Sequence, residues 1–161
     1  MRRTIPIRLF AVAVAIGSLT AIPLSSPSSA ATAGATCSKL VSPPPKTVNG
    51  VSMSNSTVSG CTPVSATGGS GKSVTNLKTF VSTTTWAGGK GTTVEKIAYK
   101  ATTSKGKCPA GTSHILSTGT VTGGTGAAAK VIKKGAKVTA SVCVNTKTSA
   151  ASLEPGTKYV F

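Results

Sequence analysis

The stretch Lys137-Val138-Thr139-Ala140-Ser141-Val142-Cys143-Val144-Asn145 carries the clearest alternation of apolar and polar residues in this chain. Successive side chains of a β-strand point to opposite faces, so this period of two predicts a strand with one buried face. The residues expected on the buried face are Val138, Ala140, Val142 and Val144. Cys143 should then point away from the core, so its partner has to cross the outer face of the sheet or come from a loop.

Further strands are expected on both sides of this one, because the chain is rich in Thr, Ser, Val and Gly and β-branched residues fit pleated sheets. They are residues 47–54, 72–86, 92–102, 113–122 and 157–161. Residues 72–86 alternate poorly, which indicates a bulge or two short strands. Asn49-Gly50 is a tight-turn sequence within the first of these strands. Helical periodicity is weak, apart from a single turn expected within residues 127–134.

Short strands separated by glycine-rich turns predict an all-β fold. We expect a small antiparallel β-sandwich, immunoglobulin-like or related, that is braced by two disulfides. A small β-barrel is the alternative arrangement of the same strands.

The four cysteines predict two disulfides, as is usual for a small exported domain. Three connectivities are open, and we favour Cys37–Cys61 and Cys108–Cys143 because sequential pairing closes the shortest loops. Each bridge should contribute about 3 kcal/mol by restricting the unfolded chain. Large apolar residues are few, so a thin core has particular need of such cross-links. The wide cysteine spacings argue against a zinc site, and no metal site is expected.

Residues 1–30 are typical of a secretory signal peptide. Arg2, Arg3 and Arg8 accompany an apolar run over residues 9–22, and small residues at 28–30 form a cleavage site, with a second candidate at 33–35. The apolar run is too short for a comfortable membrane span, so no transmembrane segment is expected after the signal is removed. We expect residues 31–46 to be an extended N-terminal segment and residues 47–161 to be a single β domain to which Cys37 is tied. The protein should be secreted, to the extracellular space or the cell envelope.

Without the signal, the chain is strongly basic. Its three arginines all lie in the signal, so 15 lysines remain against Glu95 and Glu154, a net charge of +13. Such a charge favours anionic envelope polymers or lipid head groups. Specific nucleic-acid recognition is not expected, because lysine lacks the planar fork with which arginine reads bases and phosphates. The densest basic cluster, and the candidate polyanion-binding site, is Lys130, Lys133, Lys134 and Lys137.

Residues that could carry catalysis are scarce. Residues 66–73 (ATGGSGKS) match a permissive phosphate-loop pattern, but the residues that follow do not favour the helix that such a loop requires. His114 is the only histidine, and a catalytic arrangement would need it beside Glu95 or Glu154. Both glutamates are more simply explained by a salt bridge or a solvated face. We therefore assign no catalytic residues and expect no cofactor.

Four segments resemble a group of small secreted actinobacterial proteins of unassigned function. In order, they are Cys108-Pro109-Ala110-Gly111-Thr112, Gly119-Thr120-Val121-Thr122-Gly123, Val138-Thr139-Ala140-Ser141-Val142-Cys143-Val144 and Leu153-Glu154-Pro155-Gly156-Thr157. The resemblance covers roughly the last two thirds of the chain after the signal, and the order of the four segments carries it. It implies a secreted β domain and supplies no activity or site residues.

These observations favour a non-enzymatic secreted β protein that binds anionic polymer through its lysine-rich surface. A hydrolase of an envelope polymer is one alternative, and it would require a cleft that joins His114 to a glutamate. A basic, membrane-active effector is the other.

Overall fold

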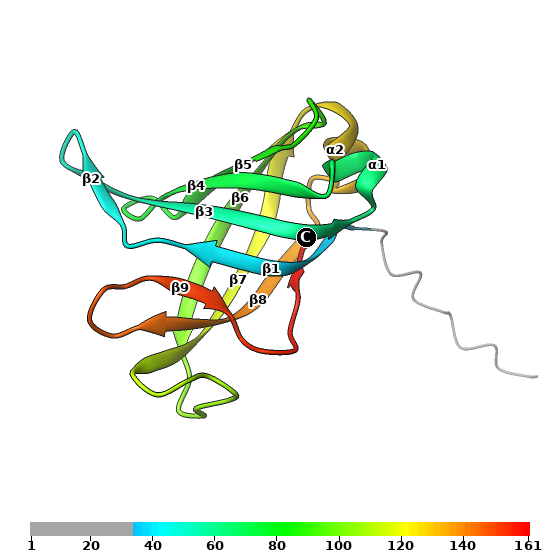
Figure 1. Ribbon diagram of the computed structural model, residues 1–161. Coiled ribbons are helices and arrows are strands. Elements are labelled where there is room, and N and C mark those ends of the chain that lie inside the picture. The colour runs from blue at the N-terminus through cyan, green and yellow to red at the C-terminus, as the bar shows by residue number, and fades with distance from the viewer. Residues whose placement is uncertain (1–33) are drawn as a thin grey trace, which may run out of the picture.

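Figure 1 shows the computed structural model, which describes residues 34–161. The expected signal peptide, residues 1–30, lies outside the described residues. The elements are β1 (Thr36–Ser42), β2 (Lys46–Val48), β3 (Val51–Thr62), α1 (Val64–Thr67), β4 (Ser70–Asn76), β5 (Val81–Trp86), β6 (Gly91–Ala101), β7 (Thr112–Gly124), α2 (Gly126–Val131), β8 (Lys137–Asn145), β9 (Ala151–Leu153) and β10 (Tyr159–Val160).

One antiparallel sheet closes on itself to form a barrel of eight strand positions. From β3 to β8, each strand of the barrel pairs with the next along the chain, and β1 pairs with β3. The eighth position is shared, because β9 and β10 each pair with β8 on one side and β1 on the other. An eight-stranded barrel has an interior just wide enough to be filled by side chains or to hold one small ligand.

The all-β antiparallel fold is confirmed, but the preferred sandwich is wrong and the alternative barrel is right. A sandwich needs two sheets, whereas every strand here belongs to one. Closure depends on β1, which lies in the segment expected to be merely extended, and on the short β9 and β10. β9 and β10 have only three and two residues, too few to show alternation, so the sequence carried little sign of the pairings that close the barrel.

The local predictions fared better than the overall arrangement. The strand over Lys137–Asn145 is β8, with Val138, Ala140 and Val142 buried in the interior. Residues 72–86 form two strands, β4 and β5, separated by a turn. Asn49 and Gly50 form the tight turn between β2 and β3, and both have positive φ angles. The helical turn expected within residues 127–134 is α2.

The two ends of the barrel, the closed end and the open end, differ in how the strands are connected. At the closed end, α1 and α2 lie close to each other over the strand ends (Figure 1). At the open end, the strands are joined by segments 43–50, 77–80, 102–111 and 146–150.

A compact apolar core fills the closed end. The Trp86 ring meets that of Phe161 edge to face at 5.0 Å between centroids, and Tyr159 lies 4.6 Å from Phe161. Gly71 is paired with Trp86 across the sheet, and a Cβ atom there would lie 3.0 Å from the indole. Glycine at this position therefore leaves the room that the indole occupies.

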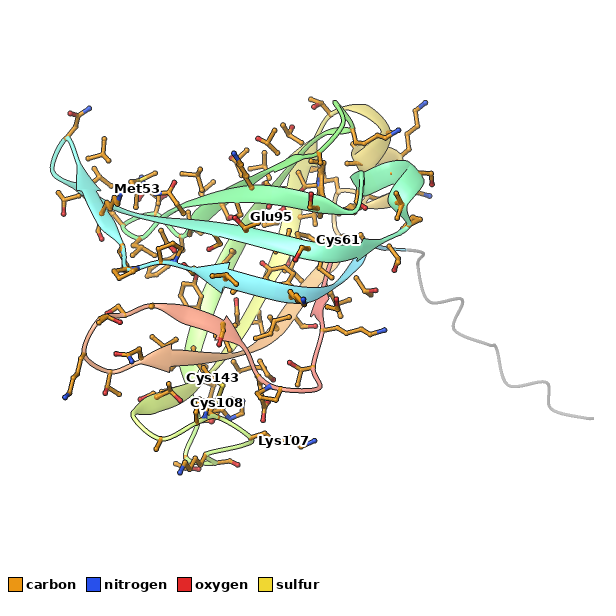
Figure 2. All side chains as sticks on the ribbon, in the orientation of Figure 1. Met53, Cys61, Glu95, Lys107, Cys108 and Cys143 are labelled. Atoms are coloured by element: carbon orange, nitrogen blue, oxygen red, sulfur yellow. A yellow bond between two sulfur atoms is a disulfide. The ribbon has the colours of Figure 1, made fainter. Side chains whose placement is uncertain are left out.

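Both disulfides expected from the spacing are present. Cys37–Cys61 joins directly paired residues of β1 and β3, inside the core. Cys108–Cys143 ties segment 102–111 to the outer face of β8 (Figure 2). Cys143 thus points away from the barrel interior, and its partner comes from a loop. Two disulfides are typical of proteins that work in an oxidising, extracellular environment.

Candidate functional site

The open end of the barrel contains a cavity of about 280 Å³. Its walls come from the inward-facing positions of β1, β3, β6, β7, β8 and β9, together with side chains of the open-end segments. The lining residues are Leu40, Ser42, Pro45, Ser54, Ser56, Leu77, Tyr99, Ile115, Ser117, Val142, Val144, Ser149 and Ala151. These residues span most of the described chain, so the site exists only when the barrel has closed.

The walls are apolar, with a few hydroxyl groups set among them. The Oγ atoms of Ser42 and Ser54 form a hydrogen bond with each other at 2.8 Å. Within residues 34–161, the Oγ atoms of Ser56 and Ser117 have no protein hydrogen-bond partner. An apolar pocket with a few placed polar groups is typical of sites for small molecules. The free hydroxyls could bond polar groups of such a molecule.

The cavity walls carry no charge, in contrast to the rest of the molecule. None of the 15 lysines that follow the expected signal, and neither glutamate, is among the lining residues. Burying an unpaired charge is far more costly than burying an apolar or hydroxyl group. The cavity is thus suited to an uncharged, largely apolar molecule.

Between the cavity and the closed-end core, the interior is lined by hydroxyl groups. Ser82 Oγ lies 2.7 Å from Ser73 Oγ and accepts a hydrogen bond from Thr75 Oγ1 at 3.1 Å. The alternation in β4 and β5 is therefore the reverse of that in β8, because Val74 and Val81 face outward and are exposed. Sequence reasoning placed valines inside only for β8 and found poor alternation in residues 72–86, so it did not find this polar interior.

Glu95 is the one carboxyl group inside the barrel, and its side chain is 0 % exposed. Figure 2 shows it in the middle of the barrel wall. Its Oε1 accepts a hydrogen bond from Thr93 Oγ1 at 2.5 Å, and Thr93 Oγ1 in turn accepts one from Trp86 Nε1 at 3.3 Å. Its Oε2 has no well-aligned partner among the described residues. The expectation of a salt bridge or solvated face is therefore wrong for Glu95.

Burial raises the pKa of Glu95 to about 7, because the charged form is poorly solvated there. The nearby hydroxyls of Thr93, Ser82 and Thr84 act in the opposite direction but are outweighed. Burial and the neighbouring Glu95 also raise the pKa of Tyr159. The interior below the cavity can thus hold a neutral carboxylic acid near neutral pH.

His114 and Glu154 meet on the outer wall, with Nε2 of the histidine 3.3 Å from Oε2 of the glutamate. Glu154 thus contacts a histidine, and the pair is a salt bridge only when His114 is protonated; the alignment of the two groups is too poor for a hydrogen bond. His114 Nδ1 lies 3.0 Å from the Ser104 carbonyl oxygen and 2.9 Å from Thr102 Oγ1. Glu154 Oε1 accepts a hydrogen bond from the Lys107 backbone N–H at 2.6 Å.

The His114–Glu154 pair and the Cys108–Cys143 disulfide together hold segment 102–111 against the barrel wall. The Thr102 hydroxyl lies 2.8 Å from the Ser104 carbonyl oxygen and 3.2 Å from the His114 carbonyl oxygen, so it too ties the segment to β7. Neither His114 nor Glu95 lines the cavity, and Glu154 does not either. The open-end cavity and the one histidine–carboxylate pair are therefore separate features.

The four clustered lysines, Lys130, Lys133, Lys134 and Lys137, are all exposed. They lie on α2, on the segment after it and at the start of β8, which places them at the closed end. Lys137 Nζ donates a weak hydrogen bond to Thr120 Oγ1 at 3.4 Å. The cluster is thus remote from the cavity and free to meet solvent or a partner.

The phosphate-loop pattern at residues 66–73 has the wrong surroundings. A helical turn, α1, precedes the glycines and a strand, β4, follows them, whereas phosphate binding needs a strand before and a helix after. In residues 34–161 no group of three or more His, Cys, Asp or Glu could hold a metal ion. The same part of the chain has no helix long and apolar enough to cross a membrane.

No protein-family model, curated protein or solved structure matches this chain.

Proposed function

We propose that this protein is a non-enzymatic, secreted binding protein that takes one small, largely apolar molecule into the open end of its barrel. The observation that carries this proposal is the uncharged cavity of about 280 Å³ in a chain that is otherwise rich in lysine. Pockets for small molecules usually begin at about 300 Å³, so the molecule should be compact. The two disulfides support a place of action outside the cytoplasm.

The wall chemistry narrows the class of ligand. Leucine, isoleucine and valine side chains favour an aliphatic or alicyclic body, and the Tyr99 ring at the rim can cover one face of it. The hydroxyls of Ser56 and Ser117 suit one or two uncharged oxygen or nitrogen atoms on the ligand. A carboxylate or ammonium group would find no opposite charge in the cavity walls.

The test is binding of an uncharged, polarity-sensitive dye such as Nile red to the purified protein. Ala151→Trp places an indole inside the cavity, whereas Ser152→Trp places the same group on the outer wall, because Ser152 is the next residue of β9 and is exposed. We expect Ala151→Trp to weaken dye binding by at least about tenfold, which corresponds to about 1.4 kcal/mol. Ser152→Trp should bind like the unmodified protein.

Thermal unfolding of both variants shows whether the barrel is intact. Equal affinity of the two folded variants, or no dye binding by the unmodified protein, would contradict the proposal.

A second candidate function is binding of an anionic envelope polymer by the lysine cluster at the closed end. It is favoured by the exposure of Lys130, Lys133, Lys134 and Lys137 on one short segment. Replacing all four with serine should lower the salt concentration that elutes the protein from an anionic matrix. The matched control replaces Lys39, Lys72, Lys96 and Lys158, which are exposed elsewhere on the barrel, and so removes the same charge. Equal elution of the two variants would show that net charge, not this cluster, binds the matrix.

A further inference from the structure

Two turns at the open end have the same sequence pattern and the same geometry. Residues 76–79 (NLKT) and residues 145–148 (NTKT) are both Asn-x-Lys-Thr. In each turn, the asparagine Oδ1 accepts hydrogen bonds from the backbone N–H groups two and three residues later, at 2.9–3.0 Å. In each, the fifth residue donates its N–H to the asparagine carbonyl oxygen, at 2.7 Å for Phe80 and 2.9 Å for Ser149.

The fifth residue of both turns lies in the left-handed region, with φ of 56° for Phe80 and 60° for Ser149. Residues other than glycine are uncommon there, and bulky ones are rarer still. Ser149 shows that this turn does not need an aromatic residue. Phe80 is 40 % exposed and does not belong to the buried core, so folding gives little reason for its presence. A bulky residue in a strained, exposed position is a reason to look for a role in binding.

Phe80 has one aromatic neighbour, which is exposed as well. Tyr99 is 45 % exposed and meets Phe80 edge to face, with 5.9 Å between ring centroids. The other three aromatic residues of the described chain, Trp86, Tyr159 and Phe161, are buried at the closed end. Exposed aromatic surface in residues 34–161 is thus confined to the open end, next to the cavity.

Exposed lysines lie at the same end of the barrel as these two rings. Lys78 and Lys147 occupy the same position in the two Asn-x-Lys-Thr turns, Lys46 lies on β2, and Lys100 lies near the end of β6. Carboxylates are few at this end, because Glu95 is inside the barrel and only Glu154, which contacts His114 and the backbone of segment 102–111, lies near it. Aromatic rings set among lysines are typical of surfaces that bind the interface of an anionic bilayer.

We propose that the open end docks on an anionic lipid surface, with Phe80 and Tyr99 in the interfacial region and the surrounding lysines on the lipid phosphates. In this orientation the cavity faces the bilayer, so an apolar ligand can pass between membrane and barrel without crossing water. The docking proposal depends only on the surface residues at the open end, and only the passage of ligand rests on the proposed function.

The experiment is co-sedimentation of the full secreted protein with vesicles of phosphatidylcholine, with or without phosphatidylglycerol. We expect binding only to the vesicles that contain phosphatidylglycerol, and weaker binding as salt rises. Phe80→Ser should lower the affinity about tenfold through lost apolar contact. This variant should fold normally, since Ser149 already occupies the equivalent position. Val64→Ser, at an apolar residue that is 60 % exposed at the closed end, is the matched control and should bind like the unmodified protein.

Two charge-matched variants decide which end docks. Replacing Lys46, Lys78, Lys100 and Lys147 with serine should reduce vesicle binding about a hundredfold or more at low salt. Replacing Lys130, Lys133, Lys134 and Lys137 should have a much smaller effect. Equal losses from the two variants, a larger loss from the closed-end variant, or undiminished binding by Phe80→Ser would overturn the proposal.

Dye binding without vesicles separates this proposal from the proposed function. Phe80→Ser should lose vesicle binding and keep dye binding. Ala151→Trp should keep vesicle binding and lose dye binding. Loss of both activities by either folded variant would contradict two independent sites of action at the open end.

Discussion

Replacing both Cys108 and Cys143 with alanine is expected to lower the free energy of unfolding by about 4 kcal/mol. The bridge joins residues 35 apart in sequence, and opening it lets the unfolded chain explore many more conformations. The cost falls on a protein whose core is confined mainly to one end of the barrel. Urea unfolding of the variant and the unmodified protein measures the difference.

The Cys37–Cys61 bridge provides the comparison, because it closes a shorter loop of 24 residues. Its removal should cost about 3 kcal/mol from chain entropy, and somewhat more because both sulfur atoms pack in the core. The two variants should also differ in which part of the folded chain becomes more mobile. Without Cys108–Cys143, segment 102–111 is held by the His114–Glu154 pair and its hydrogen bonds, so its amide hydrogens should exchange faster than those of the barrel. A loss below about 1 kcal/mol would show that these contacts suffice without the bridge.

The sequence supported predictions wherever a signal was local. The alternation in β8, the Asn49-Gly50 turn and the break within residues 72–86 each depend on a few neighbouring residues, and each matches the structure. The disulfide pairing followed from loop length alone. The resemblance to small secreted actinobacterial proteins stays a prediction, as does the export signal.

The closure of the barrel and the cavity were out of reach for a physical reason. Closure is a contact between strands far apart in sequence, and the strands that complete it have only three and two residues. Predicting the cavity would also have required knowing that serines of β3 and β7 face inward. In a chain this rich in Ser and Thr, a hydroxyl residue on a strand fits either face, so alternation alone did not show which face was inside.

The burial of Glu95 was missed for the same reason. Replacing this residue should have the second large effect on stability. Replacing it with glutamine should stabilise the folded protein above pH 7 by about 3 kcal/mol and change its stability little near pH 4. Glutamine has nearly the same shape as the protonated acid, and its carbonyl oxygen can accept the hydrogen bond from Thr93. It never ionises, so it avoids placing an unpaired negative charge in the barrel.

The direction in which stability changes with pH follows from the pKa of Glu95 in the folded and unfolded states. In the unfolded chain the carboxyl group loses its proton near pH 4.5. In the folded barrel the same group keeps its proton up to about pH 7. Between these values the unfolded state binds fewer protons, so rising pH favours unfolding. The stability contributed by the protonated acid is complete below pH 4.5 and is lost as pH rises to about 7. A shift of this size corresponds to about 3 kcal/mol.

The measurement is the difference in free energy of unfolding between Glu95→Gln and the unmodified protein, from urea titrations between pH 4 and pH 8. Taking the difference removes titrations that the two proteins share. The other titratable groups that act on this part of the interior are Tyr159 and Tyr99, and burial raises the pKa of each above its ordinary value of 10.0. Neither tyrosine therefore ionises within this range. A difference that grows between pH 4.5 and 7 and then levels off identifies Glu95 as the buried acid, whereas a difference that stays constant with pH would mean that its carboxylate is solvated in the folded protein.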